Sequence, residues 1–228
     1  MNDFVVAVTG ASGSIYAVRL LEVLVELGCR VHVTISPAAT EVLRQELGIT
    51  VDLNHFEVDH LLPPNAERGG DSRVGMLLTG GSSSYAFSSV LSDSTVSPGN
   101  LIYHHYKDFS AGIASGSFMT AGMVICPCSM GTLASIAGGQ STNLIHRAAE
   151  VHLKERRQLV VVPRETPLSS IQLDNMQRLA VAGAVILPAM PGFYHNPLTI
   201  HDLIDFMVGR ICDQLGLTQN LFERWGHR

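Results

Sequence analysis

Charge is scarce in this sequence. Only 15% of its 228 residues are charged, while 46% are hydrophobic, and the formal net charge is -5. Soluble domains usually carry about 25% charged residues, so we expect part of this surface to be covered by further copies of the chain. The longest basic block is the short stretch from Lys154 to Arg157, which argues against a nucleic-acid-binding surface.

Long apolar runs are missing as well. No stretch approaches the about 20 consecutive apolar residues that span a bilayer. The first residues also lack a cationic segment followed by a long apolar one, which is the pattern of a secretory signal. We therefore expect no membrane association and a cytoplasmic location.

Metal-site and hydrolase motifs are absent too. The sequence has four cysteines, and the closely spaced Cys126 and Cys128 have no second pair that would complete a zinc site. The ten histidines do not show the spacing of a metal site with carboxylate support. GASGS at 10–14 does not match the G-x-S-x-G turn of serine hydrolases. We therefore predict reduced, structural cysteines, no metal site and no hydrolase activity.

Short apolar, β-branched runs alternate with helical patterns along most of the chain. The first run leads into TGASGS and a helical pattern that Gly28 ends, and the second leads into a helix begun by Ser36 and Pro37. This alternation is typical of the crossover units of a parallel sheet. We predict one domain, residues 1–228, with a doubly wound, mostly parallel α/β sheet of the Rossmann or flavodoxin type in three α/β/α layers. The predicted strands are 4–8, 30–35, 123–126, 159–162 and 184–187, and the predicted helices are 15–27, 36–47, 131–138, 142–155, 170–182 and 201–216.

A long polar stretch interrupts this pattern. Residues 52–122 are rich in glycine, serine and proline, so we predict loops there, including a Gly/Ser-rich insertion at about 64–100. The interleaved aromatic residues, among them Tyr103 and Tyr106, indicate that the stretch is partly ordered.

Polar residues follow the predicted strands, where ligands bind in open parallel sheets. The turn Gly10–Gly13 lacks the full G-x-G-x-x-G spacing. Its glycines, the Ser12 hydroxyl and the helix N-terminus favour a phosphate or a mononucleotide, and an ordinary tight turn is the alternative. SMGTL at 129–133 offers hydroxyl and amide donors at a helix start, with simple N-capping as the alternative.

Several charged or aromatic residues also occupy informative positions. Arg147 and Lys154 are seven residues apart and share a helix face, which is either solvated or a binding face. Arg164 and Glu165 directly follow an apolar strand, either as part of a ligand site or as a surface ion pair. Arg210 lies among apolar helix residues, where a charge needs a partner.

Six blocks of the sequence together resemble the UbiX-type flavin prenyltransferases. They are TGASGSIYAVRLLE, VICPCSMGTLASIAGGQSTNLIHRAAEVHLKERR, LVVVPRETPLSSI, NM, GAVILPAMPGFYHNP and ERWG. The likeness covers residues 3–50 and 120–228. It implies an enzyme that joins a dimethylallyl group from dimethylallyl monophosphate to reduced FMN without a metal. The prenylated FMN is then the cofactor of UbiD-type decarboxylases, and the assembly is a homododecamer built from trimers.

The resemblance also implies roles for individual residues. Catalysis would depend on Glu165, Ser12 and Tyr194. FMN would be contacted by Gly10, Ala11, Ser12, Ser36, Ser129, Met130, Gly131, Thr132 and Arg147. The prenyl phosphate would be held by Lys154, Arg164, Glu165, Tyr194 and Arg210, with Trp225 closing the site, although Trp225 alone is equally a packing residue.

Two features depart from the family pattern. Pro37 stands where the family often has lysine, and Phe109, Gly112 and Ile113 precede ASGS at 114–117, where prolines and an aromatic residue are usual. These changes indicate an altered prenyl donor or rate.

Two alternative functions remain open from the sequence. One is an FMN-dependent decarboxylase of peptidyl or pantothenoyl cysteine, in which Arg164 and Glu165 have no role. The other is a non-catalytic flavin-binding or assembly subunit, in which the long insertion blocks the prenyl pocket.

Overall fold

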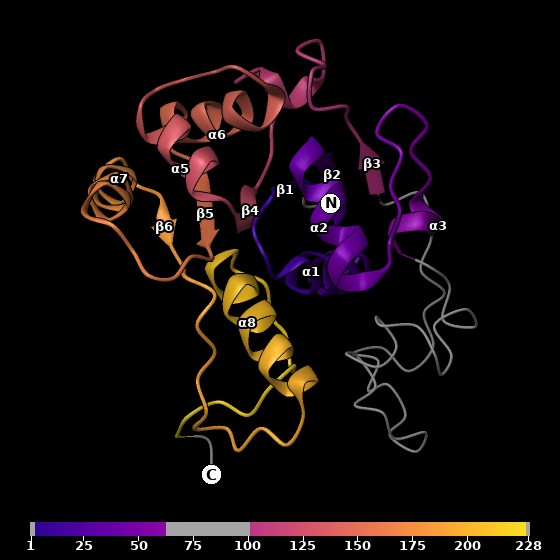
Figure 1. The fold of residues 1–228 in the computed structure, drawn as a ribbon, viewed down its shortest axis with the longest axis vertical. Helices are drawn as coiled ribbons and strands as arrows, with labels where there is room; N and C mark the ends of the chain where they lie inside the picture. Colours follow the sequence, from indigo (N-terminus) through magenta and orange to yellow (C-terminus); the bar gives the residue numbers. More distant parts are fainter. Residues whose placement is uncertain (1–2, 63–100, 227–228) are drawn as a thin grey trace.

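The computed structural model, which describes residues 3–62 and 101–226, contains one sheet of six parallel strands (Figure 1). Their order in the sheet is β3-β2-β1-β4-β5-β6. The predicted doubly wound α/β fold is confirmed, and every strand pair is parallel. The strands are β1 Asp3–Val8, β2 Arg30–Ile35, β3 Leu101–Tyr103, β4 Gly122–Cys128, β5 Gln158–Pro163 and β6 Val185–Ile186.

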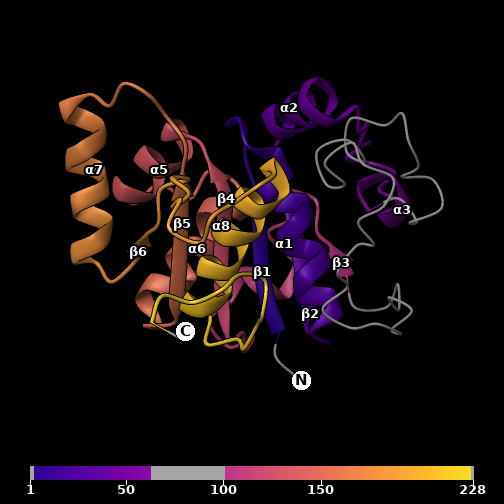
Figure 2. The ribbon, with the colours of Figure 1, turned by 90° about the horizontal axis from the view of Figure 1, so that it is seen from below.

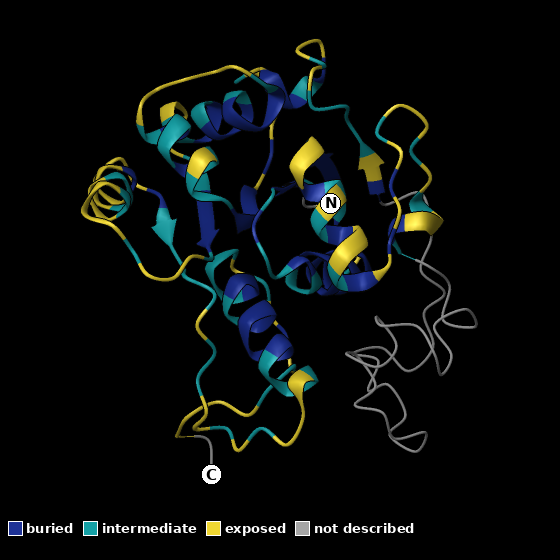
Figure 3. Cartoon of the chain, in the orientation of Figure 1, coloured by how far each residue is buried: buried dark blue, intermediate teal, exposed yellow. Residues whose placement is uncertain are grey.

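Helices cover both faces of this sheet (Figure 2). Successive residues of β1 point to opposite faces, so Val6 and Val8 join the hydrophobic cluster with α1 and α8, whereas Val5 and Ala7 join the cluster with α5 and α6. The prediction of three layers is therefore confirmed. Helix α7 packs on the outside of α5, and Figure 3 shows it largely exposed. The helices are α1 Ser14–Glu26, α2 Pro37–Leu47, α3 Val58–Leu61, α5 Met130–Ala137, α6 Leu144–Lys154, α7 Ser170–Val181 and α8 Ile200–Gln214.

The ends of these elements follow the residues that the sequence offers. Ser36 caps α2, because its side chain accepts a hydrogen bond from Ala39 N at 3.2 Å. Pro37 occupies the first turn, where its missing N–H costs nothing, and Gly48 ends the helix with φ of 73°. Pro37, one of the departures from the family pattern that the sequence resembles, thus has a structural role as the first residue of α2.

The stretch predicted as loops contains more structure than expected. Strand β3 pairs with β2 along Val31–Val33, and the Tyr103 ring stacks on Phe56 with 4.2 Å between the centroids. The Tyr103 hydroxyl donates to Leu53 O at 3.0 Å. A three-residue strand is too short to show the alternation of apolar and polar residues that predicts strands. The aromatic residue Tyr103 was the one feature of the sequence that indicated order in this segment. The predicted insertion at 64–100 lies outside the described residues.

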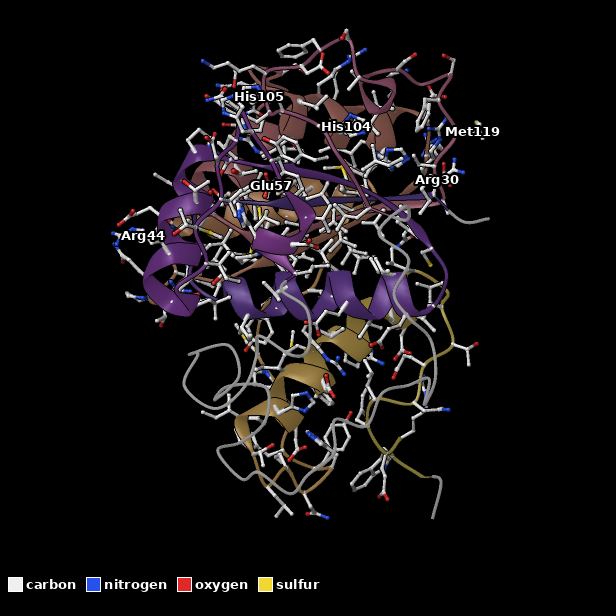
Figure 4. The ribbon with its side chains drawn as sticks, turned by 90° about the vertical axis from the view of Figure 1, so that its right-hand side faces the viewer. Arg30, Arg44, Glu57, His104, His105 and Met119 are labelled. Carbon is white, nitrogen blue, oxygen red and sulfur yellow. The ribbon has the colours of Figure 1, made fainter. Side chains whose placement is uncertain are left out.

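Two histidines contact each other beside this edge strand. His32 on β2 is 4% exposed, and its Nδ1 lies 2.9 Å from Nε2 of His104, which follows β3 and is labelled in Figure 4. Burial lowers the pKa of both rings below the usual 6.5. The charged groups that act on the pair are Asp3 and Arg30 at His32, and Asp108 at His104.

This pair makes the folded state sensitive to acid. Because the folded pKa values of His32 and His104 are lowered, their neutral rings stabilise the fold above the unfolded pKa of 6.5, and that stabilisation is lost as the pH falls through the folded values. We expect the free energy of unfolding, measured with urea, to fall from about pH 7.5 to about pH 5.5. The double variant His32→Phe/His104→Phe should fall less, while the exposed control His55→Gln should follow the wild type. A double variant that loses as much stability as the wild type contradicts this account.

Candidate active site

The strand order reverses between β1 and β4: β2 and β3 follow on one side of β1, and β5 and β6 follow on the other side of β4. Ligands bind beyond the carboxyl ends of the strands at such a point. The turn Gly10–Gly13 follows β1, and Ser129 follows β4. Ser129 N donates to Thr9 Oγ1 at 2.8 Å, so the structure brings the two predicted flavin-contacting loops together.

The glycine turn is held close to the start of α2. A Cβ on Gly10 would lie 2.4 Å from Ala38 Cβ, so a larger residue there requires the backbone to move. Gly13 has φ of 103°, a left-handed conformation that favours glycine. Ser36 N donates to Val8 O at 3.0 Å, which places the cap of α2 beside this turn.

A carboxylate from α2 occupies the N-terminus of α1. Glu46 accepts hydrogen bonds from Gly13 N at 3.0 Å, Ser14 N at 2.9 Å and Ser14 Oγ at 2.6 Å. Burial by itself raises the pKa of Glu46, but hydrogen bonds from Ser12, Ser14 and Gly13 outweigh it and hold the pKa below the usual 4.5. An internal carboxylate therefore takes the amides of Gly13 and Ser14, and the binding of a phosphate or a mononucleotide at this turn stays a prediction.

Removing that carboxylate should loosen the turn. We expect Glu46→Ala to lower the free energy of unfolding by about 1–2 kcal/mol, since charge-assisted hydrogen bonds to a partly exposed group are lost. Because the folded pKa of Glu46 is lowered, the stabilisation is present above the unfolded pKa of 4.5 and is lost as the pH falls through the folded value. Urea titrations of the variant should therefore approach the wild type in acid. Glu41→Ala, an exposed position on the same helix, is the control; an equal loss in both variants contradicts this role.

Two helices that begin at this edge are capped by serine hydroxyl groups. The Ser36 side chain begins α2, and the Ser129 side chain begins α5, where Ser129 Oγ accepts from Thr132 N at 3.3 Å and donates to Thr132 Oγ1 at 3.1 Å. A Cβ on Gly131 would meet nothing within 4 Å, so the first turn of α5, which also carries Met130, has open space beside it. The N-termini of α2 and α5 at this edge are therefore suited to an anion.

Arg164 lies at the same edge. Its Nε donates to Ser12 O at 3.3 Å, so the end of β5 contacts the turn after β1. Arg164 is half-buried, and the neighbouring Glu165 is exposed, with its Oε1 accepting from Thr166 N at 3.0 Å. Arg164 therefore contacts the turn at the switch point, whereas Glu165 bonds to the adjacent Thr166 N.

Lys154 and Arg147 lie elsewhere in the chain. Lys154 ends α6, pairs with Glu155 and precedes β5, whereas Arg164 follows β5. At about 3.3 Å per strand residue, β5 separates the two positions by about 20 Å. Arg147 Nε donates to Ala114 O at 3.0 Å. The structure therefore does not bring Lys154 and Arg164 together within one chain.

A third group of predicted site residues surrounds α8. Tyr194 packs edge-on against Trp225, with 5.6 Å between the ring centroids, and both line a cavity of about 460 Å³. Arg210 has the partner that its apolar surroundings required, because its Nη1 lies 2.8 Å from Asp213 Oδ2. Figure 1 shows that the segments before and after α8 project away from the sheet. Several apolar residues of this arm are exposed, namely Met190, Phe193, Leu198, Ile200 and Trp225.

Comparison with known proteins decides the family. The family model described as Flavoprotein matches residues 2–212. The flavin prenyltransferase UbiX of Halalkalibacterium halodurans is 44% identical over 98% of this chain and 93% of its own. The chain belongs to the UbiX flavin prenyltransferase family.

Solved structures agree with membership of the UbiX family. AnUbiX, solved in complex with FMN and dimethylallyl pyrophosphate, is 35% identical, with a TM-score of 0.76 over 100% of this chain and 98% of its own. A dodecameric FMN-dependent UbiX-like decarboxylase from Escherichia coli O157:H7 is 34% identical, with a TM-score of 0.73 over 98% of both chains. By contrast, the FMN-dependent cysteine decarboxylase TvaF is 14% identical with a TM-score of 0.51, so its likeness is one of fold alone.

Other features bear on the remaining predictions for this UbiX-family chain. All four cysteines are free and buried, and burial raises the pKa of Cys212 to about 12, as expected of structural thiols. Within residues 3–62 and 101–226, no cluster of three or more histidine, cysteine or acidic residues is arranged to bind a metal. In the same ranges, no helix has the length and apolar character needed to cross a membrane.

The sequence indicated most of these residues but missed two. Thr9 and Glu46 form hydrogen bonds to residues that are distant in the sequence. No local sequence pattern therefore predicts their roles. Thr9 is the first residue of the TGASGS block, but the sequence predicted flavin contacts only for the residues that follow it.

Proposed function

We propose that this protein transfers a dimethylallyl group from dimethylallyl monophosphate to reduced FMN. The contact between Arg164 and the Ser12 turn carries this proposal, because it supports a cation at the switch point of the sheet, next in sequence to Glu165. Curated relatives such as the enzyme of Halalkalibacterium halodurans are named flavin prenyltransferases. The cysteine decarboxylase and the non-catalytic subunit gain no support from a specific contact.

The residues at the switch point suit a flavin mononucleotide. The open space at Gly131 leaves room beside the first turn of α5, and Ser36 and Ser129 cap the two helices that begin at this edge. Reduced FMN would supply the nucleophilic ring that accepts the allyl group. The proposed flavin contacts are Gly10, Ala11, Ser12, Ser36, Ser129, Met130, Gly131, Thr132 and Arg147.

The departing phosphate needs positive charge and a proton. Cations stabilise negative charge as it develops on a leaving group, and we assign that role to Lys154, Arg164 and Arg210. Tyr194 and Ser12 add neutral donors. Glu165, next to Arg164 and exposed after the end of β5, would carry a proton between the phosphate and the ring.

One active site would draw on more than one chain. Lys154 and Arg164 are about 20 Å apart along β5, so a phosphate that binds both must lie between two subunits. The exposed apolar arm around α8 suits burial against another copy, where Trp225 would close the site. The related Escherichia coli protein is dodecameric, and we propose the same assembly here.

The wider setting completes the proposal. A prenylated FMN made here would serve a UbiD-type decarboxylase, and we place the enzyme in the cytoplasm, acting as a single flavoprotein domain.

Anaerobic incubation tests the proposed reaction. Protein, reduced FMN and dimethylallyl monophosphate are mixed, the flavin is extracted and its mass is measured. We expect a gain of one dimethylallyl group, and none when FMN stays oxidised, because only the reduced ring is nucleophilic enough. An unchanged flavin mass, despite FMN binding, contradicts the proposal and supports a non-catalytic flavin-binding protein.

A further inference from the structure

Thr9 links the two loops that meet at the switch point. It directly follows β1, and only 1% of its surface is exposed to solvent. Its Oγ1 donates to Pro127 O at 2.8 Å and accepts from Ser129 N at 2.8 Å. The Thr9 N–H also donates to Pro127 O, at 3.3 Å. The hydroxyl therefore acts as donor and acceptor at once within the protein.

A hydroxyl is needed here because the ladder between β1 and β4 stops. The last backbone pair in the register is Ala7 with Ile125, and Pro127 has no N–H to donate. Beyond that point the Thr9 N–H and hydroxyl both bond to Pro127 O, and the hydroxyl extends the connection to Ser129 N. Without it, the Ser129 N–H loses the acceptor that the structure gives it, and a partly buried donor left unpaired is costly.

Ser129 passes this constraint on to α5. It is the N-cap of that helix, so its backbone position sets the direction of the first amides of α5 and of the Thr132 hydroxyl that it contacts. We propose that Thr9 is a positioning residue for flavin binding, which fixes Ser129 and the first turn of α5 against the turn Gly10–Gly13. This inference rests on the proposed function only in taking a flavin as the ligand at this edge.

Three variants separate positioning from general stability. Thr9→Val keeps the shape and removes the hydroxyl, whereas Thr9→Ser keeps the hydroxyl. Thr34→Val is the matched control, because Thr34 is 0% exposed on the neighbouring strand, pairs with Ala7, and its hydroxyl has no hydrogen-bond partner in the described part of the chain. The dissociation constant of FMN is measured by flavin fluorescence, at a temperature where circular dichroism shows each variant folded.

We expect Thr9→Val to weaken FMN binding about tenfold or more, with Thr9→Ser and Thr34→Val within about twofold of the wild type. Because Thr9 acts through Ser129, adding Ser129→Ala to Thr9→Val should weaken binding by less than the two single effects combined. If Thr9→Val does not fold, Thr9→Ala, which also removes the hydroxyl, takes its place with the same expected loss of FMN affinity.

The inference is overturned if folded Thr9→Val or Thr9→Ala binds FMN as the wild type does, or if Thr34→Val weakens binding equally. These measurements need no prenyl donor. A protein that failed to prenylate FMN would therefore still give a clear answer on Thr9, and an unchanged FMN affinity would overturn the role of Thr9 even if prenyl transfer were observed.

Discussion

Glu165→Gln should lower the rate of flavin prenylation by about 10²–10⁴-fold, the usual contribution of a positioned acid or base. Glutamine keeps the size and one acceptor oxygen of Glu165 but cannot carry a proton. Because Glu165 is exposed and bonds only to the adjacent Thr166 N among the described residues, the fold and the FMN dissociation constant should stay close to the wild-type values. Anaerobic turnover, followed by the mass of extracted flavin, gives the rate.

A matched control makes this result specific. Glu57→Gln changes an exposed carboxylate that precedes α3, near the edge strand β3, and is labelled in Figure 4. This carboxylate pairs with His60 at 3.4 Å. The variant should prenylate FMN at the wild-type rate. A Glu165→Gln enzyme with full activity rules out proton transfer by this carboxylate, and one with lost FMN binding shows that Glu165 acts on the flavin rather than on the prenyl phosphate.

Mixed oligomers should recover activity that neither parent possesses. Lys154→Ala removes a cation from one end of β5, and Glu165→Gln removes the carboxylate from the other. We assume that each active site takes Lys154 from one chain and Glu165 from a different, neighbouring chain. When the two variants assemble in equal amounts, each of these chains carries the intact residue in about half of the sites. About a quarter of the sites therefore contain both intact residues. Co-expression with two tags and tandem purification yields the mixed species for assay.

The control for this experiment uses two changes at the same strand end. Arg164→Ala and Glu165→Gln affect adjacent residues of one chain, so co-assembly of these two variants should restore no site. Recovery in this control, or none in the mixture of Lys154→Ala with Glu165→Gln, contradicts a site shared in this way between subunits.

The sequence predicted the central strands and the helix starts because those signals are local. The run Leu159–Val162 is buried on both faces of β5, which is what a continuous β-branched stretch in a parallel sheet indicates. Ser36 and Ser129 cap helices as their spacing suggested. Strand β3 was missed, since three residues cannot display a period and only the stacking of Tyr103 on Phe56 reveals its packing.

The candidate site was predicted less completely, because side chains from distant segments define it. Glu46 accepts hydrogen bonds at the N-terminus of α1 only because α2 packs beside it, and no sequence pattern indicated this contact. The predicted strand 159–162 already separates Lys154 from Arg164, but the residue types alone suggested a single phosphate site for both. Comparison with relatives shows the family, and the shared site follows only from the proposal that Lys154 and Arg164 bind the same phosphate.

A structure of the assembled protein with FMN and dimethylallyl monophosphate tests the central claim most directly. The account predicts that the prenyl phosphate lies within about 4 Å of Arg164 from one chain and of Lys154 from a neighbouring chain, next to the flavin ring. A phosphate bound by Arg164 with every Lys154 in the assembly far from it would contradict the account.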